Sequence, residues 1–358
     1  MSVDSILLAG HFNASALEQS FKRAFNAIGV QTQCFDFRAS RSELGWLLRN
    51  RWTHRLTIRS GRIREKSFRA FSRLFEDSVL RSGARVVVIF PLEFVLPETL
   101  RNLRREGVRV VYFYPDNPFQ PAPTARPETI PAARESDLCL IYSEVLAHKL
   151  KDAGVPNPVF LPFGWDPEAF PYQNDQPQGS WPGVVFIGTW DRHRERFLEK
   201  LARHVPLRIY GEGYWGTRTM PFSRARRCWQ GRPLYLGDAA RAMRQSAVCL
   251  NILRPQHIID GVPDGLIMRH LEVPGAGGFL LSTRGGGATT IFPEGETAEY
   301  YSGLDECIEK IDKYLTNESG RRELVERAHA AVASHHTYID RVQHILRLLD
   351  NRQGKASA

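Results

Sequence analysis

Short apolar runs alternate with amphipathic helical segments along this 358-residue chain, and this alternation constrains the fold more than any other feature. In the first half, the runs with the composition of buried strands cover residues 5–9, 30–37, 85–90, 108–114, 138–142 and 159–161. Several of the helical patterns that follow them end at a glycine, as at Gly29, Gly107 and Gly154. A repeat of strand, helix and strand predicts a mostly parallel sheet with right-handed crossovers.

A second series of strands and helices begins after a polar segment rich in Pro, Gln and Asn. Its predicted strands cover residues 184–187, 207–210, 247–252 and 279–282. Its predicted helices cover residues 194–204, 239–245, 267–273, 301–315, 320–334 and 338–349. We therefore predict an α/β protein with two Rossmann-like, doubly wound parallel-sheet domains that face a central cleft. The predicted segments are an N-terminal domain at 1–166, a linker at 167–183, a C-terminal domain at 184–337 and a final helix at 338–358.

Hydrophobic residues make up 42% of the chain and charged residues 24%, which is ordinary for a globular protein with sizeable cores. We expect a cytoplasmic protein from the features of its start and from its cysteines. No apolar run approaches the roughly 20 residues needed to cross a bilayer, and Met1–Ser5 lacks the features of a signal peptide. The five cysteines are widely spaced, and an odd number cannot form a complete disulfide framework. We predict no metal site and no cofactor, since the sequence has neither a CxxC motif nor a Cys/His cluster.

The formal net charge of +9 is concentrated between Arg49 and Arg73, where nine Lys or Arg residues are opposed only by Glu65. Such a cluster attracts polyanions or acidic lipid surfaces. Apolar residues are interleaved with the charges, so one hypothesis is peripheral contact with the inner face of a membrane. The alternative is a solvated helix face. We do not expect nucleic acid to be a partner.

The segment from Asp264 to Leu281 carries the most specific chemical pattern. Asp264 and Glu272 are eight residues apart, which places them roughly on one face of a helix. If that helix begins near Gly265, its free N–H groups can bind a diphosphate, and Glu272 can accept hydrogen bonds from ribose hydroxyls. Arg269 can contact the same diphosphate or pair with Glu272. The alternative is an amphipathic helix whose charges face water.

In this context the C-terminal half resembles the CgeB-like, spore-maturation glycosyltransferases, a group of enzymes with the GT-B fold. The resemblance rests on Val185–Gly188 with Arg194, Leu207–Gly213, Cys249–Asn251, Arg269–Glu272 with Gly275–Gly278, and His336–Tyr338 with Arg341. It implies a nucleotide-diphosphate sugar as donor, no metal, a retaining course, and a final helix that crosses back to the first domain. It also implies that Glu272 holds the donor ribose and that Asp264 contacts the transferred sugar. The family carries Glu at the position of Asp264, so this shorter carboxylate departs from the family pattern.

Further donor-binding candidates follow other predicted strands. Arg194 lies six residues after the Gly188 turn, where its guanidinium can neutralise a departing diphosphate. The remaining candidates are glycines that permit close backbone approach, or side chains that can stack on a base or face the donor: Gly10, His11, Tyr210, Gly211, Gly213, Tyr214, Trp215, Asn251, Gly277 and Gly278. The segment 282–287 is predicted to be a mobile loop near the donor. Each of these also has a structural alternative as a turn or a core residue.

Two carboxylates are candidates for a general base that acts on the acceptor. Asp116 and Glu93 each follow a buried strand and could take a proton from an acceptor hydroxyl, or simply cap a turn. A retaining enzyme would not need that base. The sequence does not name the acceptor, which could be a glycan, a lipid-linked saccharide, a protein or a small molecule.

Other classes of enzyme lack their motifs in this sequence. Gly10 is not part of the GxGxxG of a dehydrogenase, and neither the phosphate-binding loop GxxxxGK[ST] nor the hydrolase motif GxSxG is present. The main alternative is a non-catalytic protein of GT-B shape that binds a membrane surface or a polyanion. Such a protein would have lost the catalytic residues of its relatives. The presence of Arg194, Asp264 and Glu272 argues against this alternative.

Overall fold

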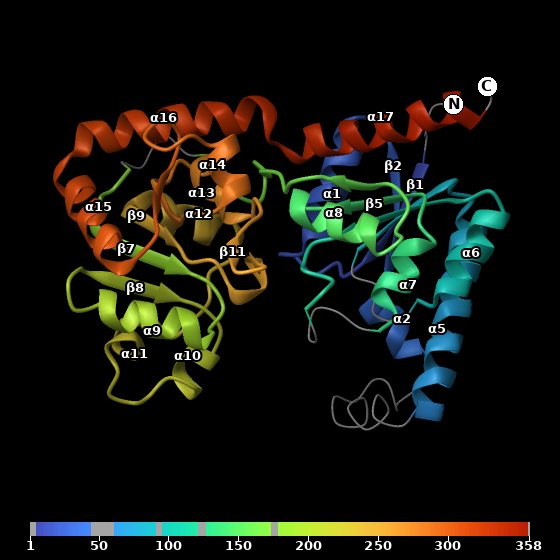
Figure 1. Cartoon of the computed structure of the whole chain (residues 1–358), viewed down its shortest axis with the longest axis horizontal. Helices are drawn as coiled ribbons and strands as arrows, with labels where there is room; N and C mark the ends of the chain where they lie inside the picture. Colours follow the sequence, from blue (N-terminus) through green and yellow to red (C-terminus); the bar gives the residue numbers. More distant parts are fainter. Residues whose placement is uncertain (1–4, 44–60, 91–94, 121–126, 173–177, 357–358) are drawn as a thin grey trace. The chain divides into compact units, whose positions relative to one another are not determined.

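The computed structural model describes residues 5–43, 61–90, 95–120, 127–172 and 178–356. The chain divides into two compact units (Figure 1). Unit 1 comprises Met1–Leu161 and Val342–Ala358, and unit 2 comprises Pro162–Arg341. Each unit is built around one parallel sheet, which confirms the predicted fold class of two doubly wound α/β domains.

The sheet of unit 1 has six strands in the order β2-β1-β3-β4-β5-β6. All neighbouring strands are parallel. Their bounds are β1 (Ser5–Gly10), β2 (Gln31–Asp36), β3 (Val86–Ile89), β4 (Arg109–Tyr114), β5 (Leu138–Ile141) and β6 (Pro158–Phe160). The order reverses between β1 and β3, which is the switch point where open α/β sheets commonly bind ligands.

The helices of unit 1 are α1 (Leu17–Ala27), α2 (Phe37–Glu43), α5 (Gly61–Ser82), α6 (Pro97–Arg105), α7 (Thr129–Arg134) and α8 (Glu144–Asp152). Their apolar faces and the sheet form a phenylalanine-rich core, in which the ring of Phe21 contacts those of Phe90 and Phe113 at centroid distances of 5.0 and 5.3 Å. Such edge-to-face and tilted pairs add to the burial of the rings. The predicted second strand stops at Asp36, because Phe37 already begins α2.

The sheet of unit 2 has five parallel strands in the order β13-β12-β9-β7-β8. Their bounds are β7 (Trp181–Ile187), β8 (Leu207–Tyr210), β9 (Ser246–Asn251), β12 (Leu280–Thr283) and β13 (Glu299–Tyr301). A short antiparallel hairpin, β10 (Ile258–Ile259) and β11 (Val262–Pro263), lies outside this sheet. The sequence pattern missed the hairpin and β13, because strands of two or three residues are too short to show a period.

The helices of unit 2 are α9 (Arg192–Leu201), α10 (Tyr214–Thr217), α11 (Arg224–Cys228), α12 (Leu236–Gln245), α13 (Arg269–Gly275), α14 (Gly286–Ile291), α15 (Leu304–Thr316) and α16 (Glu318–His335), with a 3-10 turn at Pro255–His257. The short helices α10, α11 and α14 were not predicted. Segment 282–287, expected to be a mobile loop, instead ends β12 and begins α14.

The last helix, α17 (Tyr338–Ala356), begins in unit 2 and belongs to unit 1 from Val342 onward. Within unit 1, the Arg109 guanidinium donates to the Leu349 carbonyl at 2.9 Å. In the part of the chain that the structure describes, no helix is long and apolar enough to span a membrane.

Candidate functional site

The C-terminal ends of β7, β8 and β9 lie at one edge of the unit 2 sheet, where open parallel sheets bind ligands. Gly188 follows β7 and Gly211 follows β8, and the Gly188 N–H donates to the Tyr210 carbonyl at 2.9 Å. A Cβ atom on Gly211 would lie 2.2 Å from the Gly188 carbonyl oxygen. Only glycine therefore fits at position 211. The segments that follow β7 and β8, which we call the glycine exits, contact each other through backbone atoms.

Two tryptophans hold these exits in place. The indole Nε1 of Trp215 donates to the Gly188 carbonyl at 3.0 Å, and that of Trp229 donates to the Gly211 carbonyl at 3.1 Å. Trp215 is fully buried, so this predicted stacking candidate is part of the scaffold. Tyr214 remains exposed beside it, with its ring under the Arg218 guanidinium. Of the two aromatic candidates, only Tyr214 has a face available to a flat base.

Arg194 lies in the first turn of α9, next to Gly188, but its guanidinium does not project outward. Its Nε and Nη2 atoms donate to the Ile252 carbonyl at 3.0 and 2.7 Å, and Nη1 donates to the Thr189 carbonyl at 3.2 Å. The Arg194 residue is only 6% exposed. The prediction that Arg194 binds the diphosphate directly is therefore corrected: this side chain joins the β7 exit to the β9 exit and supports the site from beneath.

Three guanidinium groups nevertheless gather at this edge. Burial lowers the pKa of Arg194 to about 10; Asp191 opposes that shift, and the positive charges of Arg254 and Arg269 add to it. The Nε atom of Arg254 is buried and has no hydrogen-bond partner among the described residues. An unpaired buried donor is costly, so a bound anion at Arg254 would supply the missing acceptor.

His257, which follows Arg254 in the same turn, cannot balance this charge. Burial lowers its pKa to about 3, and the nearby Arg194 and Arg254 charges push it in the same direction. His257 is therefore neutral at physiological pH. Neither Arg254 nor His257 was identified from the sequence, although Arg254 stands three residues after the end of β9. A basic residue so close to the end of a central strand was the signal that could have found it.

The Asp264–Glu272 segment differs from its prediction. Helix α13 begins at Arg269, not near Gly265, because Asp264 follows the hairpin strand β11 and Gly265 adopts a left-handed conformation at φ 91°. That conformation cannot be part of a right-handed helix. Asp264 and Glu272 therefore do not share a helix face. The predicted cradle of free N–H groups at Gly265 is absent too.

Glu272 is instead paired inside the unit. Its carboxylate accepts from Arg269 Nη1, and Arg269 Nε donates to the Ile187 carbonyl at 3.3 Å. Burial raises the pKa of Glu272, and Arg269 partly opposes the shift. The Glu272 side chain is 4% exposed, whereas that of Arg269 is 26% exposed. Glu272 thus orients Arg269, whose side chain stays partly accessible near the end of β7.

Asp264 lies beside the glycines at the start of α14. Cβ atoms built on Gly286 and Gly287 would lie 3.7 and 3.6 Å from Asp264 Oδ1. A Cβ on Gly285 would lie 3.3 Å from the Pro263 carbonyl oxygen. The structure therefore brings the Asp264 turn and the exit of β12 together, although they are far apart in sequence.

Asn251, a predicted donor ligand, is committed to an internal network. Its amide donates to Ser282 Oγ at 2.9 Å, and Ser282 also contacts His270 Nε2 at 2.9 Å. The Ile267 N–H contacts His270 Nδ1 at 3.1 Å, which leaves Nε2 protonated to face Ser282. Burial lowers the pKa of His270 to about 4, so the neutral ring is retained. This network fixes the ends of β9 and β12 rather than offering groups to a ligand.

Gly277 and Gly278 lie elsewhere. They precede β12, so they are at the opposite edge of the sheet from the strand exits described above. Gly277 has φ 80°, and a Cβ on it would lie 2.7 Å from the Tyr172 ring. A Cβ on Gly278 would lie 2.9 Å from the Met243 carbonyl oxygen. Their role as donor ligands stays a prediction, and in the structure these glycines permit close packing around α13 and β12.

In unit 1, Gly10 ends β1 at the switch point and His11 follows it. The His11 N–H donates to Glu18 Oε1 at 2.8 Å, and a Cβ on Gly10 would lie 2.4 Å from the same oxygen. Burial raises the pKa of Glu18. Glu18 was not predicted as a site residue from the sequence; it reaches back from the first turn of α1 and fixes the His11 backbone. Gly10 is thus required by this carboxylate, independent of any ligand.

The acceptor-base candidates receive little support. Asp116 follows β4 and is half-buried, and the neighbouring Asn117 caps the turn by accepting from the Phe119 N–H at 3.0 Å. Glu93 lies outside the described residues. Across the ranges that the structure describes, no three His, Cys, Asp or Glu residues are grouped to hold a metal ion.

The predicted basic cluster is described only in part. Residues 49–60 lie outside the described residues, and the later members fall on α5. On that helix Lys66, Arg69 and Arg73 are exposed, while Phe68 and Phe71 are buried. Arg69 forms an i,i+4 ion pair with Glu65 at 2.7 Å. The described part is an amphipathic helix with its charged face in solvent.

Comparison with known proteins places this geometry in context. Residues 192–347 match the glycosyl transferase-like sequence family. The structure of HepE from Anabaena in complex with UDP and glucose is similar with a TM-score of 0.62 at 10% identity, and the match covers 97% of this chain and 99% of that chain. No curated protein sequence matches the chain.

Two further structures show the same similarity. Sucrose-phosphate synthase from Thermosynechococcus elongatus has a TM-score of 0.65 at 13% identity over 99% of this chain and 100% of that chain. A glycosyltransferase from Rickettsia africae has a TM-score of 0.64 at 11% identity over 96% of this chain and 97% of that chain. This chain therefore has the fold of the GT-B glycosyltransferases, with a glycosyl transferase-like sequence over residues 192–347.

Proposed function

We propose that this protein is a glycosyltransferase of the CgeB-like group that moves a sugar from a nucleotide-diphosphate sugar to an acceptor. The observation that carries the proposal is the group of Arg194, Arg254 and Arg269 beside the glycine exits of the unit 2 sheet. A diphosphate is the anion that suits several guanidinium groups beside glycines that permit close approach of the backbone. The glycosyl transferase-like match and the UDP and UDP-glucose complexes of HepE support the same class of ligand.

The proposed roles follow from the contacts. Arg254 and Arg269 bind the diphosphate, and Glu272 orients Arg269 from its buried position. Arg194 is a positioning residue, because it is bonded to the Ile252 and Thr189 carbonyls. We propose that Asp264, next to the glycines of α14, contacts hydroxyls of the transferred sugar.

The chemistry needs positive charge that is already in place. When the bond between the sugar and the diphosphate breaks, negative charge builds on the departing phosphate. Fixed guanidinium groups stabilise that charge without reorganisation. We therefore propose a metal-independent reaction, and a retaining course as the family resemblance implies. The acceptor remains open among glycans, lipid-linked saccharides, proteins and small molecules.

The first experiment is a thermal-shift and donor-hydrolysis screen with UDP-glucose, other UDP-sugars and GDP-sugars, with and without EDTA. We expect one donor class to raise the melting temperature and to be hydrolysed slowly, with no effect of EDTA. Arg269→Ala and Glu272→Gln should each lower the rate by roughly 10²-fold. Arg203→Ala, an exposed arginine just after α9, is the matched control. The proposal fails if no nucleotide sugar stabilises the wild-type protein.

A non-catalytic binding protein of the same fold is the second candidate. The exposed basic face of Lys66, Arg69 and Arg73 favours it. This candidate predicts that liposomes or another polyanion stabilise the protein while nucleotide sugars do not. Stabilisation by a donor together with turnover would exclude it.

A further inference from the structure

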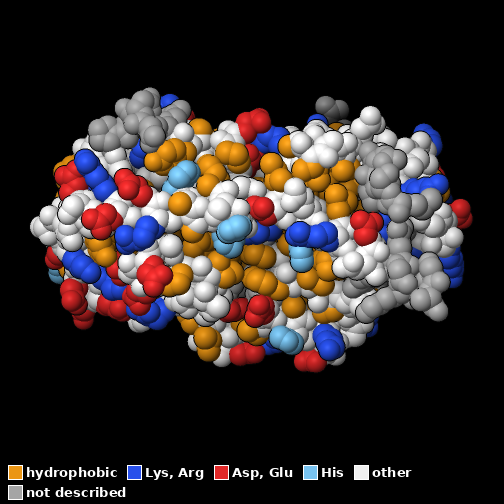
Figure 2. Space-filling view, turned by 90° about the horizontal axis from the view of Figure 1, so that it is seen from above, with side chains coloured by type: hydrophobic (Ala, Val, Ile, Leu, Met, Phe, Trp, Pro, Cys, Tyr) orange, Lys and Arg blue, Asp and Glu red, His pale blue; other side chains and the backbone are white. Residues whose placement is uncertain are grey.

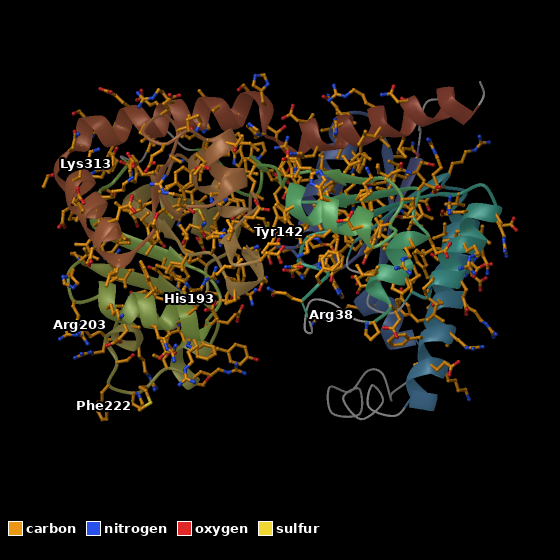
Figure 3. The ribbon with its side chains drawn as sticks, viewed as in Figure 1. Arg38, Tyr142, His193, Arg203, Phe222 and Lys313 are labelled. Carbon is orange, nitrogen blue, oxygen red and sulfur yellow. The ribbon has the colours of Figure 1, made fainter. Side chains whose placement is uncertain are left out.

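An exposed apolar tip projects from unit 2 between α10 and α11. Figure 3 shows Phe222 at the outer end of this loop, pointing away from the ribbon. Phe222 is 91% exposed and Met220 is 70% exposed, with Pro221 between them. Large apolar side chains this exposed gain from leaving water.

Hydrogen bonds hold the tip in a defined turn. The Ser223 N–H donates to the Met220 carbonyl at 3.0 Å, and the Ser223 hydroxyl caps α11 by accepting from the Arg226 N–H at 3.0 Å. Thr219 is buried at the base of the loop, and the Ala225 N–H donates to Glu199 Oε2 at 2.9 Å. These contacts hold Phe222 outward before any partner arrives.

Arginines flank the apolar tip in the sequence. Residues 213–237 contain no Asp or Glu, and they contain five arginines: Arg218, Arg224, Arg226, Arg227 and Arg232. Among the described residues, none of these five forms an ion pair with a carboxylate. The face of unit 2 seen in Figure 2 differs, because Lys and Arg side chains there are interspersed with Asp and Glu. The tip therefore combines apolar side chains with arginines that form no ion pair among the described residues.

We propose that residues 218–227 dock unit 2 onto an anionic lipid surface, with Met220 and Phe222 entering the interface. Arginines beside an inserted apolar side chain can bind lipid phosphates with bidentate geometry. A bilayer accommodates a narrow tip, whereas a stable protein partner needs a complementary surface of roughly 800 Å². This surface is separate from the α5 face, and it does not depend on transferase activity.

The test is co-sedimentation of the full-length protein with vesicles of phosphatidylcholine, with or without phosphatidylglycerol. We expect binding only to the anionic vesicles, and weaker binding as salt is raised. Met220→Ser/Phe222→Ser should reduce the partition coefficient about tenfold or more, since two apolar side chains no longer insert. Arg224→Glu/Arg227→Glu should reduce it by at least that factor, because each lost arginine contributes roughly fivefold.

The matched controls are Val145→Ser, an exposed apolar residue on α8, and Arg347→Glu, an exposed arginine on α17. Both should bind as the wild type does. All variants should melt as the wild type does, because the altered side chains are exposed. The proposal is overturned if the wild type binds neither kind of vesicle. It is also overturned if both tip variants bind anionic vesicles as the wild type does, because the lipid contact would then lie on another surface. It is also overturned if gel filtration shows a dimer that the Met220→Ser/Phe222→Ser variant loses.

Discussion

Substitution of Arg194 should mainly lower the stability of the fold, whereas substitution of Arg254 should mainly weaken donor binding. Both arginines lie at the same edge of the unit 2 sheet. Arg194 is bonded to two backbone carbonyls, those of Ile252 and Thr189. In Arg194→Ala these buried acceptors lose their donors, at about 1–3 kcal/mol each. We therefore expect about 3 kcal/mol of lost stability, or a fall in melting temperature of roughly 10 °C.

Arg254→Ala should have the opposite profile. Its Nε atom has no protein partner among the described residues, so truncation removes an unpaired buried donor and relieves repulsion with Arg194. The melting temperature of the ligand-free protein should stay the same or rise slightly. Loss of a charge-assisted contact to a diphosphate should weaken nucleotide binding by about 10- to 100-fold.

The assay is calorimetric titration with UDP and with the donor found in the screen, beside thermal denaturation of the ligand-free variants. Arg203→Ala serves again as control, since its side chain is exposed in the same unit. Two results would refute the reasoning. The first is normal UDP binding by Arg254→Ala, and the second is weakened binding by Arg194→Ala at an unchanged melting temperature.

Three further predictions follow from single contacts. His270 has a pKa of about 4 in the folded protein against an ordinary 6.5, so the unfolded chain takes up a proton first as the pH falls. Stability should drop by about 3 kcal/mol between pH 6.5 and 4, and His270→Gln should flatten that dependence in urea titrations at several pH values. Gly211→Ala should lower the melting temperature and impair donor binding because its Cβ would meet the Gly188 carbonyl, whereas Gly213→Ala has open space and should do neither. Under native conditions a thiol reagent should modify exposed Cys34 first, and unfolding should be needed for the buried thiols, whose pKa burial raises to about 12: Cys139, Cys249 and Cys307.

Much of the fold could be predicted from the sequence, because the period of apolar residues is a local property. The runs before Gly10, Gly188 and Gly211 were recognised as strands, and each ends where the pattern indicated, within a residue or two. A parallel sheet then follows from the alternation with helices. The same local reasoning identified the glycine exits, which the close approach of Gly211 to Gly188 requires.

The direction of the polar side chains was decided by the tertiary structure. Arg194 had been placed on a diphosphate, yet its acceptor is the Ile252 carbonyl, 58 residues away in the chain. The start of α13 was misplaced because a left-handed Gly265 and a short hairpin carry no periodic signal. Arg254 was missed for a related reason, since its unpaired Nε atom is visible only when the neighbouring strand exits surround it.

What the sequence by itself determined, then, is the two parallel sheets and the positions of their strand ends, because backbone periodicity depends on neighbours along the chain. Only the tertiary structure decided which charged groups support the sheet edge and which remain available to a ligand. A buried guanidinium takes whichever carbonyls are nearest in space, as the Arg194–Ile252 contact shows, and that proximity is set by strands distant in sequence.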